Sequence, residues 1–127
     1  MSEGQLPPRD LRDRTKALAL RIIRMYSALP KNTLAQTLGK QVLRSGTAIG
    51  ANFREAYRAR SDAEYLAKLG DCLKEADETI YWLELLMESG VVAAPRLSPL
   101  LDECNQLTAI LVAIVKKLKD KTNRPKA

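Results

Sequence analysis

The chain has 127 residues, of which 46% are hydrophobic and 5% aromatic, with a formal net charge of +6 and no histidine. This length fits one domain with one core, and long periodic segments with few glycines or prolines favour a helical bundle over a sheet protein. Without histidine the sequence lacks the commonest general base and the usual zinc ligand, which disfavours an enzyme.

The first two predicted helices cover residues 8–28 and 33–59. In each of them apolar residues recur every three or four positions, the spacing that gathers side chains on one helical face. Pro30 disfavours helical geometry at the preceding residue, and Asn32 or Thr33 can cap the helix that follows. We therefore expect a break between the two helices at residues 29–32.

Two more helices are predicted over residues 61–89 and 95–120. Ser61 and Glu64 match the S-x-x-E capping box at the start of the third helix, and Gly90 suits the position just after its end. Four amphipathic helices joined by short loops pack most simply as an antiparallel up-down-up-down bundle. The predicted fold is an all-α single domain over residues 1–127.

The sequence predicts no metal site, no cofactor and no catalytic residues. Cys72 and Cys104 are far apart on apolar faces, where a free thiol behaves as a small hydrophobic group. Asp71, Glu75 and Glu78 have the spacing of a helical carboxylate cluster, but bundle di-iron sites need inward carboxylates and Glu-x-x-His pairs. A polar stripe facing solvent or a partner is the preferred interpretation.

The segment GTAIG, residues 46–50, raises the question of a phosphate loop. It matches neither common glycine-rich phosphate motif, and its flanks are helical. Ser45, Gly46 and Gly50 instead favour close approach of a neighbouring helix, although a kink is also compatible with two glycines. Asn52 lies seven residues after Ser45, and we expect both to make interhelical hydrogen bonds that fix the register.

Two charged stripes are predicted on the outer faces of the second and third helices. One contains Lys40, Arg44, Arg54 and Arg58, and the other Glu64, Asp71, Glu75 and Glu78, with Trp82 on the same acidic face. Both are expected to point away from the bundle core, so that they could pair only with another subunit or a ligand. A contact between unlike stripes can close into a ring, with Trp82 as its anchor.

A basic pole follows from the predicted topology. The start of the first helix, the second turn and the end of the last helix share one end of an up-down-up-down bundle. Positive charge gathered there makes phosphate backbones the expected partner, against the alternative of a soluble surface with loose tails. The predicted nucleic-acid-binding residues are Arg9, Arg12, Lys16, Arg54, Arg58, Arg60, Lys116, Lys117, Lys119 and Lys121.

The segments LPKNT and GKQVLRSGTAIGANFREAYRARSDAEYLAKLGDCLKEADETIYWLELL closely resemble the proteins encoded in intervening sequences of bacterial large-subunit ribosomal RNA genes. Their relatives include the accessory variability determinant of diversity-generating retroelements. The resemblance implies a four-helix bundle that forms a homopentameric ring. For the retroelement branch it also implies nucleic-acid binding and a reverse transcriptase partner.

The expected function is therefore a non-enzymatic oligomeric scaffold that binds RNA or DNA. The alternative is a protein-interaction module that binds no nucleic acid. The polar N-terminus lacks the apolar segment of a signal peptide, and no run approaches the roughly 18 apolar residues that span a bilayer. We expect a cytoplasmic protein without membrane contact.

Overall fold

The computed structural model describes residues 8–123, with side chains described from Asp10 onward. Four helices make up this part of the chain, and it contains no strand: α1 (Pro8–Ser27), α2 (Thr33–Tyr57), α3 (Asp62–Glu88) and α4 (Ala94–Thr122). The predicted all-α fold is confirmed.

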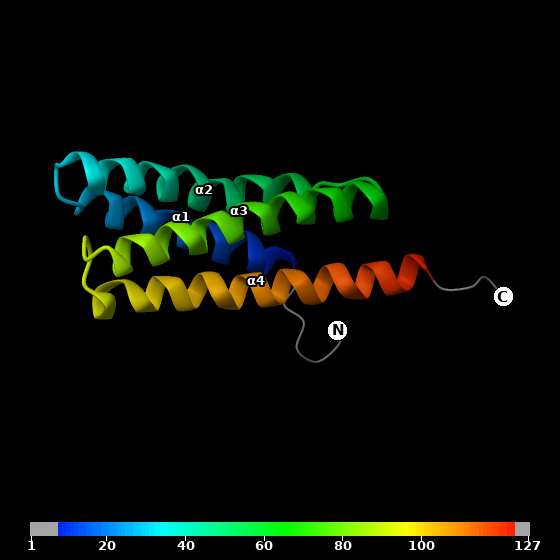
Figure 1. The fold of residues 1–127 in the computed structure, drawn as a ribbon. Coiled ribbons are helices and arrows are strands. Elements are labelled where there is room, and N and C mark those ends of the chain that lie inside the picture. The colour runs from blue at the N-terminus through cyan, green and yellow to red at the C-terminus, as the bar shows by residue number, and fades with distance from the viewer. Residues whose placement is uncertain (1–7, 124–127) are drawn as a thin grey trace.

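The helices lie side by side and alternate in direction (Figure 1). Each packs against the next, and α4 closes the bundle against α1. The diagonal pairs, α1 with α3 and α2 with α4, have no Cα atoms within 8 Å of each other in the described residues. Contact is most extensive between α2 and α3 and sparsest between α1 and α4. The seam between α1 and α4 is therefore the most open side of the bundle.

The helix ends follow from local hydrogen bonds. The Asn32 side chain caps α2 by accepting from the backbone N–H of Ala35 at 2.9 Å. At α3, Ser61 Oγ accepts from the Glu64 N–H at 3.1 Å. The Glu64 carboxylate accepts from the N–H of Arg60 at 3.3 Å, one residue before the Ser61 N–H that a capping box would use. Gly90 follows α3 with a φ of +80°, a conformation that favours glycine.

One core runs the length of the bundle and takes residues from all four helices. Phe53 is its largest fully buried side chain. Cys72 and Cys104 are fully buried too, and burial is the main cause that raises the pKa of each thiol to about 12. Both thiols are therefore protonated at neutral pH. The other fully buried large side chains are Leu11, Leu18, Ile22, Val42, Ile49, Leu69, Leu83, Leu86, Leu97, Leu107 and Leu111.

Glycines of α2 form the contact with α1. A Cβ atom added at Gly46 would collide with the Ile22 side chain. A Cβ atom at Gly50 would lie 3.3 Å from Thr15 Oγ1 and 3.4 Å from the Thr15 backbone. Helix α2 continues unbroken through both glycines, so this segment is neither a phosphate loop nor a break in the helix. The two glycines instead allow the close approach of α1.

A buried polar pair joins α2 to α3. Thr79 Oγ1 lies 2.8 Å from Ser45 Oγ, and the two hydroxyls also bond to backbone carbonyls of their own helices. Asn52 is only half-buried and its side chain makes no hydrogen bond within the described residues. The expected register-fixing bond is therefore present at Ser45 and absent at Asn52, which lies at the edge of the α2 and α3 contact.

The last helix is more apolar than the sequence led us to expect. By length and composition α4 could cross a membrane, since an 18-residue window has a mean hydropathy of 1.2, and 22% of that window is buried. Its Leu97, Cys104, Leu107 and Leu111 are buried in the bundle. Core packing accounts for these four residues, whereas most of the apolar window is not buried in the bundle.

Candidate nucleic-acid interface

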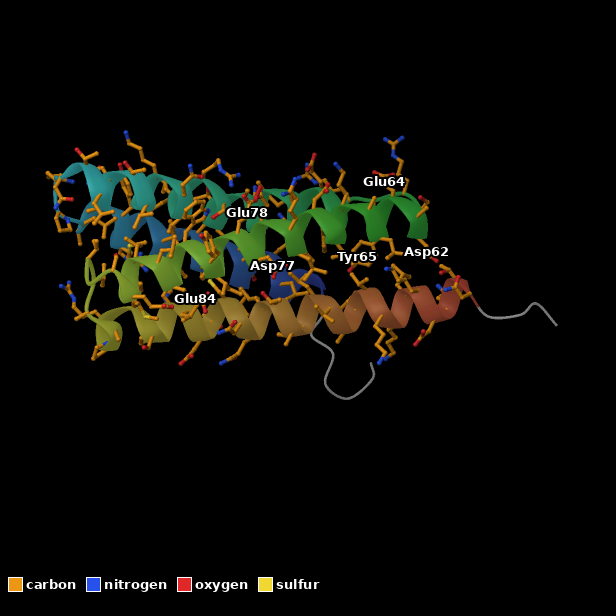
Figure 2. All side chains as sticks on the ribbon, viewed as in Figure 1. Asp62, Glu64, Tyr65, Asp77, Glu78 and Glu84 are labelled. Carbon is orange, nitrogen blue, oxygen red and sulfur yellow. The ribbon has the colours of Figure 1, made fainter. Side chains whose placement is uncertain are left out.

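The predicted charged stripes meet inside one subunit. Arg44 of α2 lies 3.2 Å from Glu75 and 3.1 Å from Glu78 of α3. Figure 2 shows Glu78 on the α2 side of α3. The expectation that the stripes could pair only with another subunit or a ligand is wrong, because residues at the border of an outer face still reach the neighbouring helix.

The two carboxylates beside Arg44 differ in their surroundings. The side chain of Glu75 is 15% exposed and that of Glu78 is 39% exposed. Burial first, and then the neighbouring Glu78, raise the pKa of Glu75, whereas the hydrogen bond with Glu75 and the nearby Arg44 lower that of Glu78. Burial lowers the pKa of Arg44, but the two carboxylates more than offset this and hold it above its usual value. The cluster behaves as an internal bridge between α2 and α3.

Trp82 lies differently from its predicted outward position. Its indole is half-buried and packs against the core, with its Nε1 buried and unpartnered within the described residues. The neighbouring Tyr81 is exposed instead, and its ring meets Trp82 edge-on at 5.0 Å. Of the other predicted interface residues, Glu64 takes part in the α3 cap, while Lys40 and Asp71 are exposed.

A basic groove lies between α1 and α2. Arg12 and Lys16 of α1 and Arg54 of α2 line a cavity of about 310 Å³, with Gly50 and Ala51 among its other residues. The glycine contact positions the groove, because it holds α1 close to α2 beneath these three side chains. Arg12 and Lys16 lie in the first half of α1, and Arg54 lies near the end of α2. All three belong to the predicted basic pole.

Three carboxylates around this end of the bundle are engaged, whereas Asp10 and Asp13 at the start of α1 make no ion pair within residues 10–123. Glu55 lies 3.6 Å from Lys68, Asp62 lies 3.4 Å from Lys121, and Glu64 belongs to the α3 cap. Figure 2 shows Asp62 at the start of α3, beside the last turns of α4. Several arginines and lysines make no ion pair within residues 10–123, and five of them lie near the groove and the turn after α2: Arg12, Lys16, Arg54, Arg58 and Arg60.

The pole is less compact than predicted. In Figure 1 the blue start of α1 lies short of the turn between α2 and α3, and the red end of α4 extends past it. The reason is length, because α1 has 20 residues and α4 has 29. The exposed residues Lys116, Lys117, Lys119 and Lys121 lie along this extended end of α4, set apart from the groove. The side chain of Arg9 lies outside the described residues.

A polar clamp across α1 and α4 was not predicted. Arg14 donates two hydrogen bonds to Glu103, at 2.8 and 2.7 Å, and a third to Gln106 at 3.0 Å. The hydrogen bonds from Arg14 are the main cause that lowers the pKa of Glu103, and the same contact raises that of Arg14. Helical periodicity predicts which residues share a face of one helix, but not which faces of two helices meet. The contact between α1 and α4 is therefore seen only in the folded structure.

The comparisons with known proteins identify the family. The sequence profile of the 23S rRNA-intervening sequence proteins matches residues 10–113. The chain belongs to this family. The groove residues Arg12, Lys16 and Arg54 all lie within the matched segment, whereas the α4 lysines from Lys116 onward lie beyond it.

A solved structure from Bacteroides thetaiotaomicron is similar to this intervening sequence protein. It is a protein of unknown function from the S23 ribosomal protein family, with 37% sequence identity and a TM-score of 0.80. The similarity covers 86% of this chain and 97% of the other. No curated protein matches the chain.

Within the described residues no group of three or more Cys, Asp or Glu side chains is arranged to hold a metal ion.

Proposed function

We propose that this protein is a non-enzymatic oligomeric scaffold that binds RNA or DNA through the groove between α1 and α2. The observation that supports it is that Arg12, Lys16 and Arg54 surround one groove and have no carboxylate partner among the residues that the structure describes. Unpaired cations attract a phosphate backbone, and the release of its counterions drives binding. The lysines at the end of α4 would extend the same contact.

Neutralising two groove cations should weaken binding in a defined way. We expect Lys16→Gln with Arg54→Gln to reduce the slope of log affinity against log salt by about 1.8 on duplex DNA, since each phosphate contact contributes about 0.9. Affinity should fall roughly five- to tenfold at moderate salt as those contacts are lost. Fluorescence anisotropy with a labelled duplex of mixed sequence measures both quantities.

The matched control is Lys31→Gln with Arg96→Gln, which removes the same charge from exposed positions at the opposite end of the bundle. This control should leave the slope unchanged. Wild-type protein that does not bind at low salt, or binds without salt dependence, would overturn the proposal. If both double variants lowered the slope equally, the groove would not be the specific site of nucleic-acid binding.

We also propose assembly into a ring, a pentamer as the family resemblance implies. Leu20 and Ile23 of α1 are 46% and 43% exposed, and an exposed apolar pair on an outer face suits a contact between subunits. Lys40 of α2 and Asp71 of α3 are exposed and could make charged contacts from other faces of the subunit. We expect Leu20→Asp with Ile23→Asp to reduce the mass in solution to that of a smaller species. An unchanged mass would exclude this face, and a monomeric wild type would exclude the ring.

The alternative function is a protein-interaction module without nucleic-acid binding. A reverse transcriptase partner, implied by the retroelement branch of the resemblance, stays a prediction. Purification from cells with and without nuclease treatment separates the two functions. A partner protein retained after nuclease treatment would favour the alternative, whereas a partner lost with the nucleic acid would favour the scaffold.

A further inference from the structure

An exposed aromatic ring stands beside the basic groove. Tyr57 is the last residue of α2, and 42% of its surface is exposed. The guanidinium carbon of Arg12, a groove residue, lies 4.8 Å from the centre of the Tyr57 ring. At this distance the guanidinium and the ring make a cation–π contact, which holds them against each other.

Tyr57 also belongs to a second hollow at the end of the bundle. This pocket has a volume of about 350 Å³ and is lined by the turn between α2 and α3, including Tyr57, Arg60 and Tyr65. Asp62, its acidic member, is paired with Lys121. The contact of Arg12 with Tyr57 therefore links the basic groove to a pocket with two tyrosines and an arginine.

Other aromatic residues of the described chain have different surroundings. Phe53 is buried, and the Tyr26 hydroxyl donates to Gln36 at 2.8 Å. Tyr81 is exposed but lies against Trp82 on the acidic helix α3. Tyr57 is thus the exposed ring that stands among cations free of carboxylate partners.

We propose that the nucleic acid bound here is single-stranded, with an unpaired base stacked on the Tyr57 and Arg12 platform. The proposal rests on the proposed function and specifies its ligand. Bases in a duplex are already stacked, whereas a single strand presents base faces that aromatic rings and guanidinium planes bind. Lys16 and Arg54 would then contact the phosphates that flank the stacked base.

The test compares labelled oligothymidine of about 16 nucleotides, the upper site size of a small single-strand-binding module, with a duplex of the same length. At equal salt we expect tighter binding of the single strand. Tyr57→Ala should reduce single-strand affinity roughly fivefold or more, in the range expected for loss of one stacked base, and leave duplex affinity unchanged. Tyr57→Phe keeps the ring and should retain the affinity of the wild type.

Two further variants separate stacking from folding. Tyr57→Leu keeps apolar bulk without a ring and should behave as Tyr57→Ala, and Tyr81→Ala removes an exposed ring from α3 and should have no effect. Circular dichroism checks that each variant keeps its helices. Equal affinity for both ligands, with no effect of Tyr57→Leu, would overturn stacking while leaving the proposed function in place. No binding of either ligand at low salt would overturn both.

Discussion

Gly46→Ala should destabilise the protein, whereas Gly70→Ala should stabilise it. Alanine is favoured over glycine inside a helix by about 1 kcal/mol at both positions. At Gly46 the added methyl group would collide with the end of the Ile22 side chain, which is fully buried. Overpacking of this kind costs about 1–3 kcal/mol, so after the helix preference is subtracted we expect a net loss of up to about 2 kcal/mol.

At Gly70 nothing lies within 4 Å of an added Cβ atom, and the residue is exposed in the middle of α3. Only the helix preference acts there, so the free energy of unfolding should rise by about 0.5–1 kcal/mol. Denaturant unfolding at one fixed protein concentration measures both changes, because assembly makes stability depend on concentration. Stabilisation by both substitutions would show that α1 and α2 are less closely packed than the structure indicates.

Glu103→Gln should destabilise the protein by about 1–2 kcal/mol at neutral pH, the range for a hydrogen bond to a charged group that is partly open to solvent. The side chains of Arg14 and Glu103 are 27% and 18% exposed. They join the two helices that touch each other least. Their loss should therefore loosen the seam between α1 and α4 first.

The same pair makes a pH dependence with a defined sign. Hydrogen bonds from Arg14 lower the pKa of Glu103 in the folded state, so its contribution is complete above the unfolded value of about 4.3 and is lost as the pH falls further. The stability difference between wild type and Glu103→Gln should shrink below that pH. Glu84→Gln, an exposed carboxylate on α3 without an ion pair in the described chain, is the control. A difference that stays constant down to pH 3 would rule out the clamp.

Local patterns account for the part of the structure that sequence reading predicted. The Ser61 cap of α3 and the glycine stop at Gly90 each act within one turn of helix, so the residues next to them in the sequence are enough to predict them. The role of Gly46 and Gly50 was predicted only in part. Their spacing indicated a contact with another helix, but not that this helix is α1.

The candidate site was predicted less well, since it depends on which faces meet. Arg44 and Arg54 lie on one predicted stripe of α2, yet Arg44 turns to carboxylates of α3 and Arg54 to the groove beside α1. Lysines and arginines of the predicted pole are likewise divided between the groove and the extended end of α4. Each of these partners depends on how far a long side chain reaches toward a neighbouring helix. A helical wheel shows one helix alone and therefore cannot predict which neighbour is reached.

Four amphipathic helices and the bundle they form follow from periodicity and from bonds between near neighbours, so they could be predicted from the sequence. Which charges cancel inside the subunit depends instead on how the helices pack. Packing pairs Arg44 with Glu75 and Glu78, and Arg14 with Glu103. Within the described residues it leaves the groove cations Arg12, Lys16 and Arg54 without an ion pair, and Arg12 lies against Tyr57. The physical reason is distance, since an ion pair forms only where the packing of two helices brings the charged ends of long side chains within about 4 Å.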